Sequence, residues 1–349
     1  MEKVRQPIFF LEYEHKDITA YVTPFLISLT YTDHEHGQSD EIDLQLEDRS
    51  ALWKSIWYPR KADRLRLRIG YDGERLLECG RFRIDELEMS GPPDTIHLKA
   101  LATGITTALR QENTVAYEHQ SLLDIAKEIA AKHGLTVVTN PRTPESGIDT
   151  VKVTRITQYR ERDLSFLKRL AEDYGYIFRI SDATLTFYER EVLESGGVIA
   201  VIDRSEISSY NFKDKTEGTY ESCEVSYHDP ETKTLISHTE HEPQVDVVDD
   251  TTDKDRPHTS IVKVDTHKVK KRVENKWQAI KKAKAHLANA NGRACDATIV
   301  LPGNPRLVAG SNITLTGFHV LDGTYHVMTS KHSITRDGGY PTELEMKRV

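Results

Sequence analysis

Hydrophobic and polar residues alternate along several short stretches in the first third of the chain. Residues 41–47 show this most clearly, since Ile42, Leu44 and Leu46 alternate with acids and an amide. That spacing predicts a strand with one buried and one solvated face. Similar patterns predict further strands at residues 8–13, 18–22, 25–32, 64–69, 80–85 and 96–100. Residues 51–58 predict a short helix, whose Trp53 and Trp57 would cover one end of a barrel.

The middle of the chain changes to helical spacing. Apolar residues recur every three or four positions over residues 164–174, and Gly175 suits a left-handed helix end. Residues 176–180 and 184–188 then predict a β-hairpin. Upstream, Ser121 is a candidate N-cap for a helix over residues 122–133, followed by a strand at 135–138 and a loop at 140–147. These elements predict an α/β module.

The last third returns to strand patterns. Strands are predicted at residues 220–228, 234–241, 294–301, 311–316, 324–332 and 342–347, with a helix at 269–289 and an acidic surface loop at 243–258. Trp277 is assigned to the partly apolar face of that helix. The expected fold class is therefore α+β, mainly β, with two β-barrels of similar topology and an α/β module between them. The predicted domains are residues 1–107, 108–200 and 201–349, with the helix embedded in the last. We detect no residue-level repeat that would prove a duplication.

Composition narrows the function classes. The chain has 349 residues with a formal net charge of -8, which argues against binding nucleic acid by neutralising phosphates. No apolar run approaches the roughly 20 residues that a membrane helix needs. The first seven residues lack a signal-peptide core, so assembly in the cytoplasm is expected. Three scattered cysteines, Cys79, Cys223 and Cys295, make no disulfide framework or metal-ligand spacing.

No catalytic, cofactor-binding or metal-binding residue is predicted, and the chain is not expected to be an enzyme. His238 and His241 are three apart in a predicted strand and would face opposite sides. The acidic loop lacks the glycine and the closing glutamate of a calcium loop. Phosphate-binding and nucleophile-elbow motifs do not occur. Paired carboxylates for glycoside cleavage stay open as an alternative.

A row of arginines at Arg64, Arg66 and Arg68 has two interpretations. One is a patch that binds nucleic acid or lipid. The other, which we favour, is a solvated strand face that pairs across to the acidic row Glu41, Asp43 and Glu47.

Three strings together resemble the late control gene D family of phage tail hub proteins, which is related to the hub part of type VI secretion spike proteins. The first covers residues 80–85 and 90–96. The second is Q-Y-x-E-x-D-L-x-F-L-x-R-L-A-E-x-x-G-Y from Gln158, preceded by residues 122–126 and 133–135. The third runs from Ala279 to Leu344 and includes residues 301–305, 307–310 and 321–325, His332, and Gly339-Tyr340.

The resemblance implies a structural role in the baseplate of a contractile phage tail or phage-tail-like particle. Family members form a homotrimeric ring in which two related barrels per subunit match a hexameric tail tube. The implied partners are other copies of the chain, the tail spike, the tail tube or its initiator, and the tape-measure protein as a further candidate. No cofactor, no specific nucleic-acid binding and no membrane insertion are implied. Because the sequence ends at Val349, directly after the last predicted strand, the spike is expected to be a separate protein, and no lysozyme-like domain is expected.

An acidic ring lumen that does not hold passing DNA is a further expectation from the net charge. The alternative function is a tail component that binds or hydrolyses cell-wall carbohydrate. That alternative predicts a cleft with stacked aromatic rings and converging carboxylates.

Overall fold

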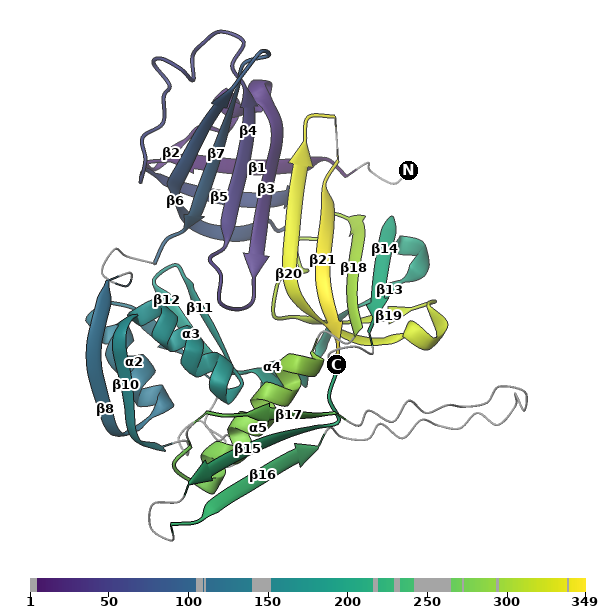
Figure 1. The fold of residues 1–349 in the computed structure, drawn as a ribbon. Helices are drawn as coiled ribbons and strands as arrows, with labels where there is room; N and C mark the ends of the chain where they lie inside the picture. The colour runs from purple at the N-terminus through teal and green to yellow at the C-terminus, as the bar shows by residue number, and fades with distance from the viewer. Residues whose placement is uncertain are drawn as a thin grey trace.

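The computed structural model describes residues 5–104, 109, 111–139, 152–215, 219–228, 233–241, 265–271, 273–292, 295–337 and 339–349. The fold is mainly β, as the sequence predicts, and its buried apolar residues form four clusters. Two clusters belong to an N-terminal and a C-terminal β lobe that share one large sheet (Figure 1). The predicted loops at residues 140–147 and 243–258 lie outside the described residues.

The N-terminal lobe is built from β1 to β7. Its elements are β1 (Pro7–Tyr13), β2 (Lys16–Asp17), α1 (Thr19–Val22), η1 (Thr23–Phe25), β3 (Leu26–His34), β4 (Glu41–Glu47), β5 (Arg64–Tyr71), β6 (Leu77–Ser90) and β7 (Thr95–Ala102). The strands pair in the order β2-β1-β5-β6-β7-β4-β3. Alternate residues of β4 are buried, as its pattern predicts.

Two predictions for this lobe are wrong in local structure. Residues 18–22 are not a strand, because Asp17 accepts a hydrogen bond from the Thr19 backbone and a short helix begins there. Residues 51–58 form turns rather than a helix. Trp53 is nevertheless buried and packs edge to face against Trp57 and Phe25, so the rings do cover one end of the lobe.

The α/β module follows. It contains β8 (Glu112–Ser121), α2 (Leu122–Lys132), β9 (Thr136–Val138), β10 (Lys152–Arg162), α3 (Asp163–Tyr174), β11 (Tyr176–Ser181), β12 (Thr184–Glu189) and α4 (Arg190–Glu194). Both predicted helices are confirmed. Ser121 and Asp124 form a reciprocal capping box at the start of α2, and Gly175 ends α3 with a φ of 75°. Strands β8 and β10, which pair with each other, were not predicted, since half of the residues of β8 are exposed and few of its residues are apolar.

The C-terminal lobe combines two distant parts of the chain. Its elements are β13 (Val198–Asp203), η4 (Arg204–Glu206), β14 (Ser209–Asp214), β18 (Cys295–Pro302), β19 (Asn312–Thr316), η5 (His319–Leu321), β20 (Gly323–Thr335) and β21 (Pro341–Arg348). They pair in the order β13-β19-β20-β21-β18-β14. The expected domain boundary at residue 200 falls inside β13.

The segment between β14 and β18 forms a separate small unit. It contains β15 (Ser222–His228), β16 (Leu235–His241), β17 (Thr266–Val269) and α5 (Lys276–Asn291). The predicted helix at 269–289 begins later than expected, because Val269 pairs with Val225 in β17 and Asn275 caps the helix by accepting from the Gln278 N–H. This helix packs on its own sheet with its own apolar cluster and is not embedded in the lobe. Trp277 is 62% exposed, so its assignment to the apolar face was wrong.

The two lobes have the same strand order. The order is β1-β5-β6-β7-β4-β3 in the N-terminal lobe and β13-β19-β20-β21-β18-β14 in the C-terminal lobe. Strands at the same place in the two orders also follow one another in the same sequence along the chain. The two lobes differ in that β1 runs antiparallel to β5, whereas β13 runs parallel to β19. The α/β module and the α5 unit are insertions into this duplicated plan. The prediction of similar topology is therefore confirmed.

The lobes join through a seam between β3 and β20. Residues 329–335 of β20 pair antiparallel with residues 28–34 of β3, and the strands lie side by side in Figure 1. Because β20 also pairs with β19 and β21, it ties both lobes into one sheet.

Candidate functional site

The described residues contain no group of three or more His, Cys, Asp or Glu side chains that could hold a metal ion. His238 bonds to Glu240 on its own strand at 3.1 Å, and His241 is exposed at the strand end. No helix among the described residues is long and apolar enough to cross a membrane.

The arginine row lies on the outer face of β5, where it makes ion pairs. Arg66 lies 3.1 Å from Glu78, and Arg68 lies 4.0 Å from Glu12. The arginines do lie on a solvated face and do form ion pairs. The predicted partners on β4 are wrong. Strand β5 pairs with β1 and β6, whereas the acidic row of β4 faces β3 and β7.

The signature string from Gln158 folds into a buried polar lock at the start of α3. The carboxylate of Asp163, 1% exposed, accepts hydrogen bonds from Gln158 at 2.7 Å, Asn113 at 2.9 Å and Lys132 at 3.1 Å. His133 at the end of α2 lies 2.7 Å from the same carboxylate. Burial alone would raise the pKa of Asp163, but these donors outweigh it and hold the pKa below the ordinary value. The string therefore joins β8, α2, β10 and α3, and its role is structural.

We expect Asp163→Asn to destabilise the module by about 3 kcal/mol, because the donors lose their charged acceptor in a buried site. Since the folded pKa is lowered, this stabilisation is present above about pH 4 and is lost as the pH falls through the folded value. Urea unfolding at pH 7 and pH 3 measures both effects. Glu172→Gln, on the exposed face of the same helix, is the control and should cost less than about 0.5 kcal/mol.

A charged latch holds the module on the N-terminal lobe. Arg179 of β11 lies 2.7 Å from Asp33 of β3 and 2.6 Å from Asp40, which precedes β4. Burial opposes the charge of Arg179, but the two carboxylates raise its pKa above the ordinary value. Burial raises the pKa of Asp40 to about 6 even beside this cation. The backbone N–H of Phe178 also donates to His36 at 2.9 Å, so β11 is fixed to the lobe at adjacent residues.

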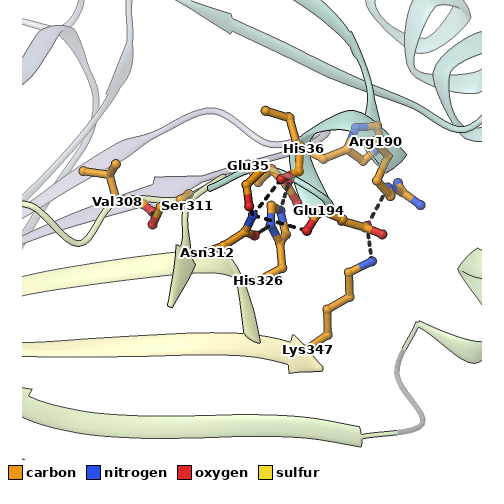
Figure 2. Close-up of polar contacts among 12 residues, drawn as sticks. Glu35, His36, Arg190, Glu194, Val308, Ser311, Asn312, His326 and Lys347 are labelled. Atoms are coloured by element: carbon orange, nitrogen blue, oxygen red, sulfur yellow. Dashed lines mark hydrogen bonds and ion pairs between the residues drawn. The ribbon is translucent and has the colours of Figure 1, made fainter. Parts of the chain in front are cut away.

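A second buried cluster ties both lobes to the end of α4. His326 of β20 is fully buried between Asn312, at 2.6 Å, and Glu35. Asn312 donates to the backbone carbonyls of Leu193, Glu194 and Gly196 at 2.8–3.2 Å. Figure 2 shows these side chains converging on the segment after α4, with Lys347 paired to Glu194 beside them. The N-terminal lobe, the module and the C-terminal lobe therefore all contribute to this one cluster.

The seam has its own polar core at His332. This side chain is fully buried, stacks on Tyr31 across the seam, and contacts Tyr340 at 2.9 Å and the Leu307 carbonyl at 3.0 Å. Burial lowers the pKa of His332 to about 4, so the ring is neutral at pH 7. His332 is one of the residues that carry the family resemblance. Its buried contacts at the seam indicate a packing role.

The outer face of the seam is an open groove with acidic lining. Its charged residues are four carboxylates and one lysine: Glu41, Asp43, Glu343, Glu345 and Lys331. Thr30, Thr32 and His34 of β3 and Thr329 of β20 complete it. These side chains point away from both lobe cores, because they alternate with buried residues along β3, β4 and β21.

A second hollow lies at the covered end of the N-terminal lobe. It is a cavity of about 480 Å³ lined by aromatic and aliphatic side chains, with Tyr21, Trp53, Trp57 and Tyr58 around it. None of the described residues that line this cavity is a carboxylate. It does not offer the converging acids that a glycoside hydrolase needs.

Comparison with known proteins identifies the family. A family model described as phage tail baseplate hub (GPD) matches residues 100–338 of the chain. The probable baseplate hub protein of Escherichia phage P2 is 28% identical over 218 residues, which cover 61% of this chain and 54% of that relative. The chain thus matches about half the length of this relative.

Solved structures of similar fold span nearly the whole chain. A tail protein from Neisseria meningitidis MC58 superposes with a TM-score of 0.71 at 13% identity, covering 98% of this chain and 97% of that one. The E. coli c3393 protein, a component of the type VI secretion system with structural similarity to the T4 tail proteins gp27 and gp5, gives a TM-score of 0.56 at 13% identity, covering 93% and 74%. At these identities the likeness concerns the fold.

Proposed function

Because the chain belongs to the phage tail baseplate hub (GPD) family, we propose that it is a structural hub protein that forms a trimeric ring between the hexameric tail tube and the spike. The observation that carries the proposal is the shared strand order of the two lobes. Three chains with two equivalent lobes each present six similar units, so a threefold ring can match a sixfold tube.

The seam supports this arrangement. It joins the two lobes of one chain edge to edge, with one continuous sheet face running across both. Placed around a ring, this face would line the lumen. The acidic groove over the seam would then repel phosphates, so DNA could pass without adhering.

The role in this proposal is structural, and the alternative of a carbohydrate-binding or hydrolytic tail component takes second place. The aromatic cavity of the N-terminal lobe, whose rings could stack on a sugar, has no carboxylate among the described residues of its lining. In the proposed setting the chain is part of the tail baseplate, assembled in the bacterial cytoplasm. Its partners are other copies of itself, the spike, the tail tube or its initiator, and the tape-measure protein.

The test is the mass of the purified chain in solution over a range of concentrations. We expect a species of three chains that grows with concentration, and this trimer should not retard duplex DNA in a gel at physiological salt. A chain that stays monomeric at every concentration, or that closes as a dimer, would overturn the ring. Tight binding of DNA by the trimer would overturn the acidic lumen.

A further inference from the structure

Among the described residues, several strand edges of the large sheet have no partner strand, and two of them belong to strands that correspond to those of the internal seam. Strand β14 pairs with β18 on one side only, and residues 86–90 of β6 pair with β7 on one side only. The edges lie at opposite ends of the joined sheet (Figure 1). Open edges invite pairing with another chain, and proteins normally cover or protect them.

The internal seam shows how such edges fit together. In the shared strand order, β6 corresponds to β20 and β14 corresponds to β3. The far half of β20 pairs antiparallel with β3 inside one chain. We infer that residues 86–90 of β6 pair antiparallel with β14 of a second copy of the chain, in the same register as this seam. The inference rests on the proposed ring and specifies its subunit interface.

Bulges at matching places set the register. The pairing of β6 with β7 shifts between Ile84 and Glu86, and the pairing of β20 with β21 shifts between Val327 and Thr329. When β6 and β20 are aligned at these shifts, Gly80 aligns with Gly323, and both glycines have a positive φ. The same alignment equates three further buried pairs: Phe82 with Tyr325, Leu67 with Leu315, and Leu65 with Ile313.

The same comparison aligns β14 with β3. The pairing of β14 with β18 matches the pairing of β3 with β4, so Phe212 corresponds to Tyr31 and Lys213 corresponds to Thr32. Carrying the seam register across then places Glu88 opposite Lys213 of the second copy, and Met89 opposite its Phe212. It also places Glu86 opposite Lys215 and Ser90 opposite Asn211.

The side chains at these positions are complementary. Glu86 and Glu88 are exposed on one edge, and Lys213 and Lys215 are exposed on the other. Opposite charges that face each other across paired strands stabilise the pairing. On the core face, Met89, which is 37% exposed in the single chain, would pack on Phe212, a contact that sulfur and aromatic rings favour. Tyr31 and His332 stack at the corresponding positions of the internal seam.

The pairing is also of the kind that forms rings. Each chain offers one edge of each kind, so the contact is head to tail, and such contacts form a ring when the rotation closes. Three copies then contain three internal seams and three seams between copies.

Charge reversal tests the interface. We expect Glu88→Lys or Lys213→Glu alone to weaken trimer formation roughly threefold to tenfold at each seam, since like charges then face each other. The double variant should restore assembly. Glu118→Lys, at an exposed position of β8 in the module, is the control for reversing a surface charge, and thermal unfolding confirms that each variant is folded.

Cysteine cross-linking tests the register. Ser90→Cys with Asn211→Cys should give disulfide-linked trimers under mild oxidation, whereas Ser90→Cys with Ser209→Cys, two residues out of register, should not. The wild-type chain, whose three cysteines are free, sets the background. A trimer without in-register cross-links and without sensitivity to the charge variants would overturn this interface and leave the ring standing. Absence of any trimer would overturn the ring and the interface together.

Discussion

Replacing Arg179 by alanine is expected to lower the free energy of unfolding by about 3–5 kcal/mol, because it leaves two buried carboxylates without their cation. Asp33 and Asp40 are 3% and 1% exposed, so their charges depend on the guanidinium for compensation. Proton uptake by Asp40 would limit the loss, since its pKa is already raised to about 6 by burial. The module should then unfold before the lobes, as a separate calorimetric transition.

A matched control lies across the same boundary. Arg81 of β6 pairs with Asp182 of the module at 3.1 Å, but both side chains are largely exposed. Arg81→Ala should therefore cost at most about 1 kcal/mol. Arg179→Lys keeps the charge but has a shorter reach than the guanidinium, whose Nη2 contacts both carboxylates, and should fall between the two. Equal effects of Arg81→Ala and Arg179→Ala would contradict the latch.

The second large effect is a pH-dependent weakening of the seam through His332. Because burial lowers its folded pKa to about 4, below the unfolded value near 6.5, its stabilisation is complete above pH 6.5 and is lost as the pH falls toward 4. Over that window the loss amounts to about 3 kcal/mol. His36, with its pKa also lowered to about 4 by burial, adds in the same direction, whereas Asp40 acts oppositely because its folded pKa is raised.

The comparison of wild type with His332→Gln isolates the contribution of this ring. Glutamine keeps a donor and an acceptor but does not take up a proton in this range. We expect the variant to be less stable than wild type at pH 7.5, and the difference to shrink by about 2–3 kcal/mol at pH 4.5. Unfolding midpoints measured across that range decide the matter. His228→Gln, at the exposed end of β15, controls for replacing a histidine, and a difference that does not change with pH would refute the assignment to His332.

Much of the local structure could be predicted from the sequence. The alternation in residues 41–47 gives β4 with the bounds Glu41–Glu47, and Ser121 and Gly175 mark helix ends that the structure confirms. These signals work because they depend on neighbours a few residues away. The errors lie where local signals conflict with distant contacts. Residues 51–58 have helical spacing, but the Asp48 carboxylate accepts from the Trp53 N–H and helps hold a series of turns.

The duplication was visible in the sequence only after the fold was known. Gly80-Arg81-Phe82-Arg83-Ile84 and Gly323-Thr324-Tyr325-His326-Val327 share a glycine, an aromatic residue and a branched aliphatic residue at the same spacing. Such a short pattern carries no weight until strand order places both copies at equivalent positions.

By itself, the sequence determined the strand and helix types, the mainly β class and the family, since periodicity, caps and a characteristic string are local properties. Only the tertiary structure decided which edges meet. The pairing of β3 with β20 and the latch at Arg179 join residues up to about three hundred positions apart, and the same packing leaves edges of β6 and β14 open. Backbone hydrogen bonds between strands are the same for any sequence, so the register and partner of an edge depend on the packing of the whole lobe.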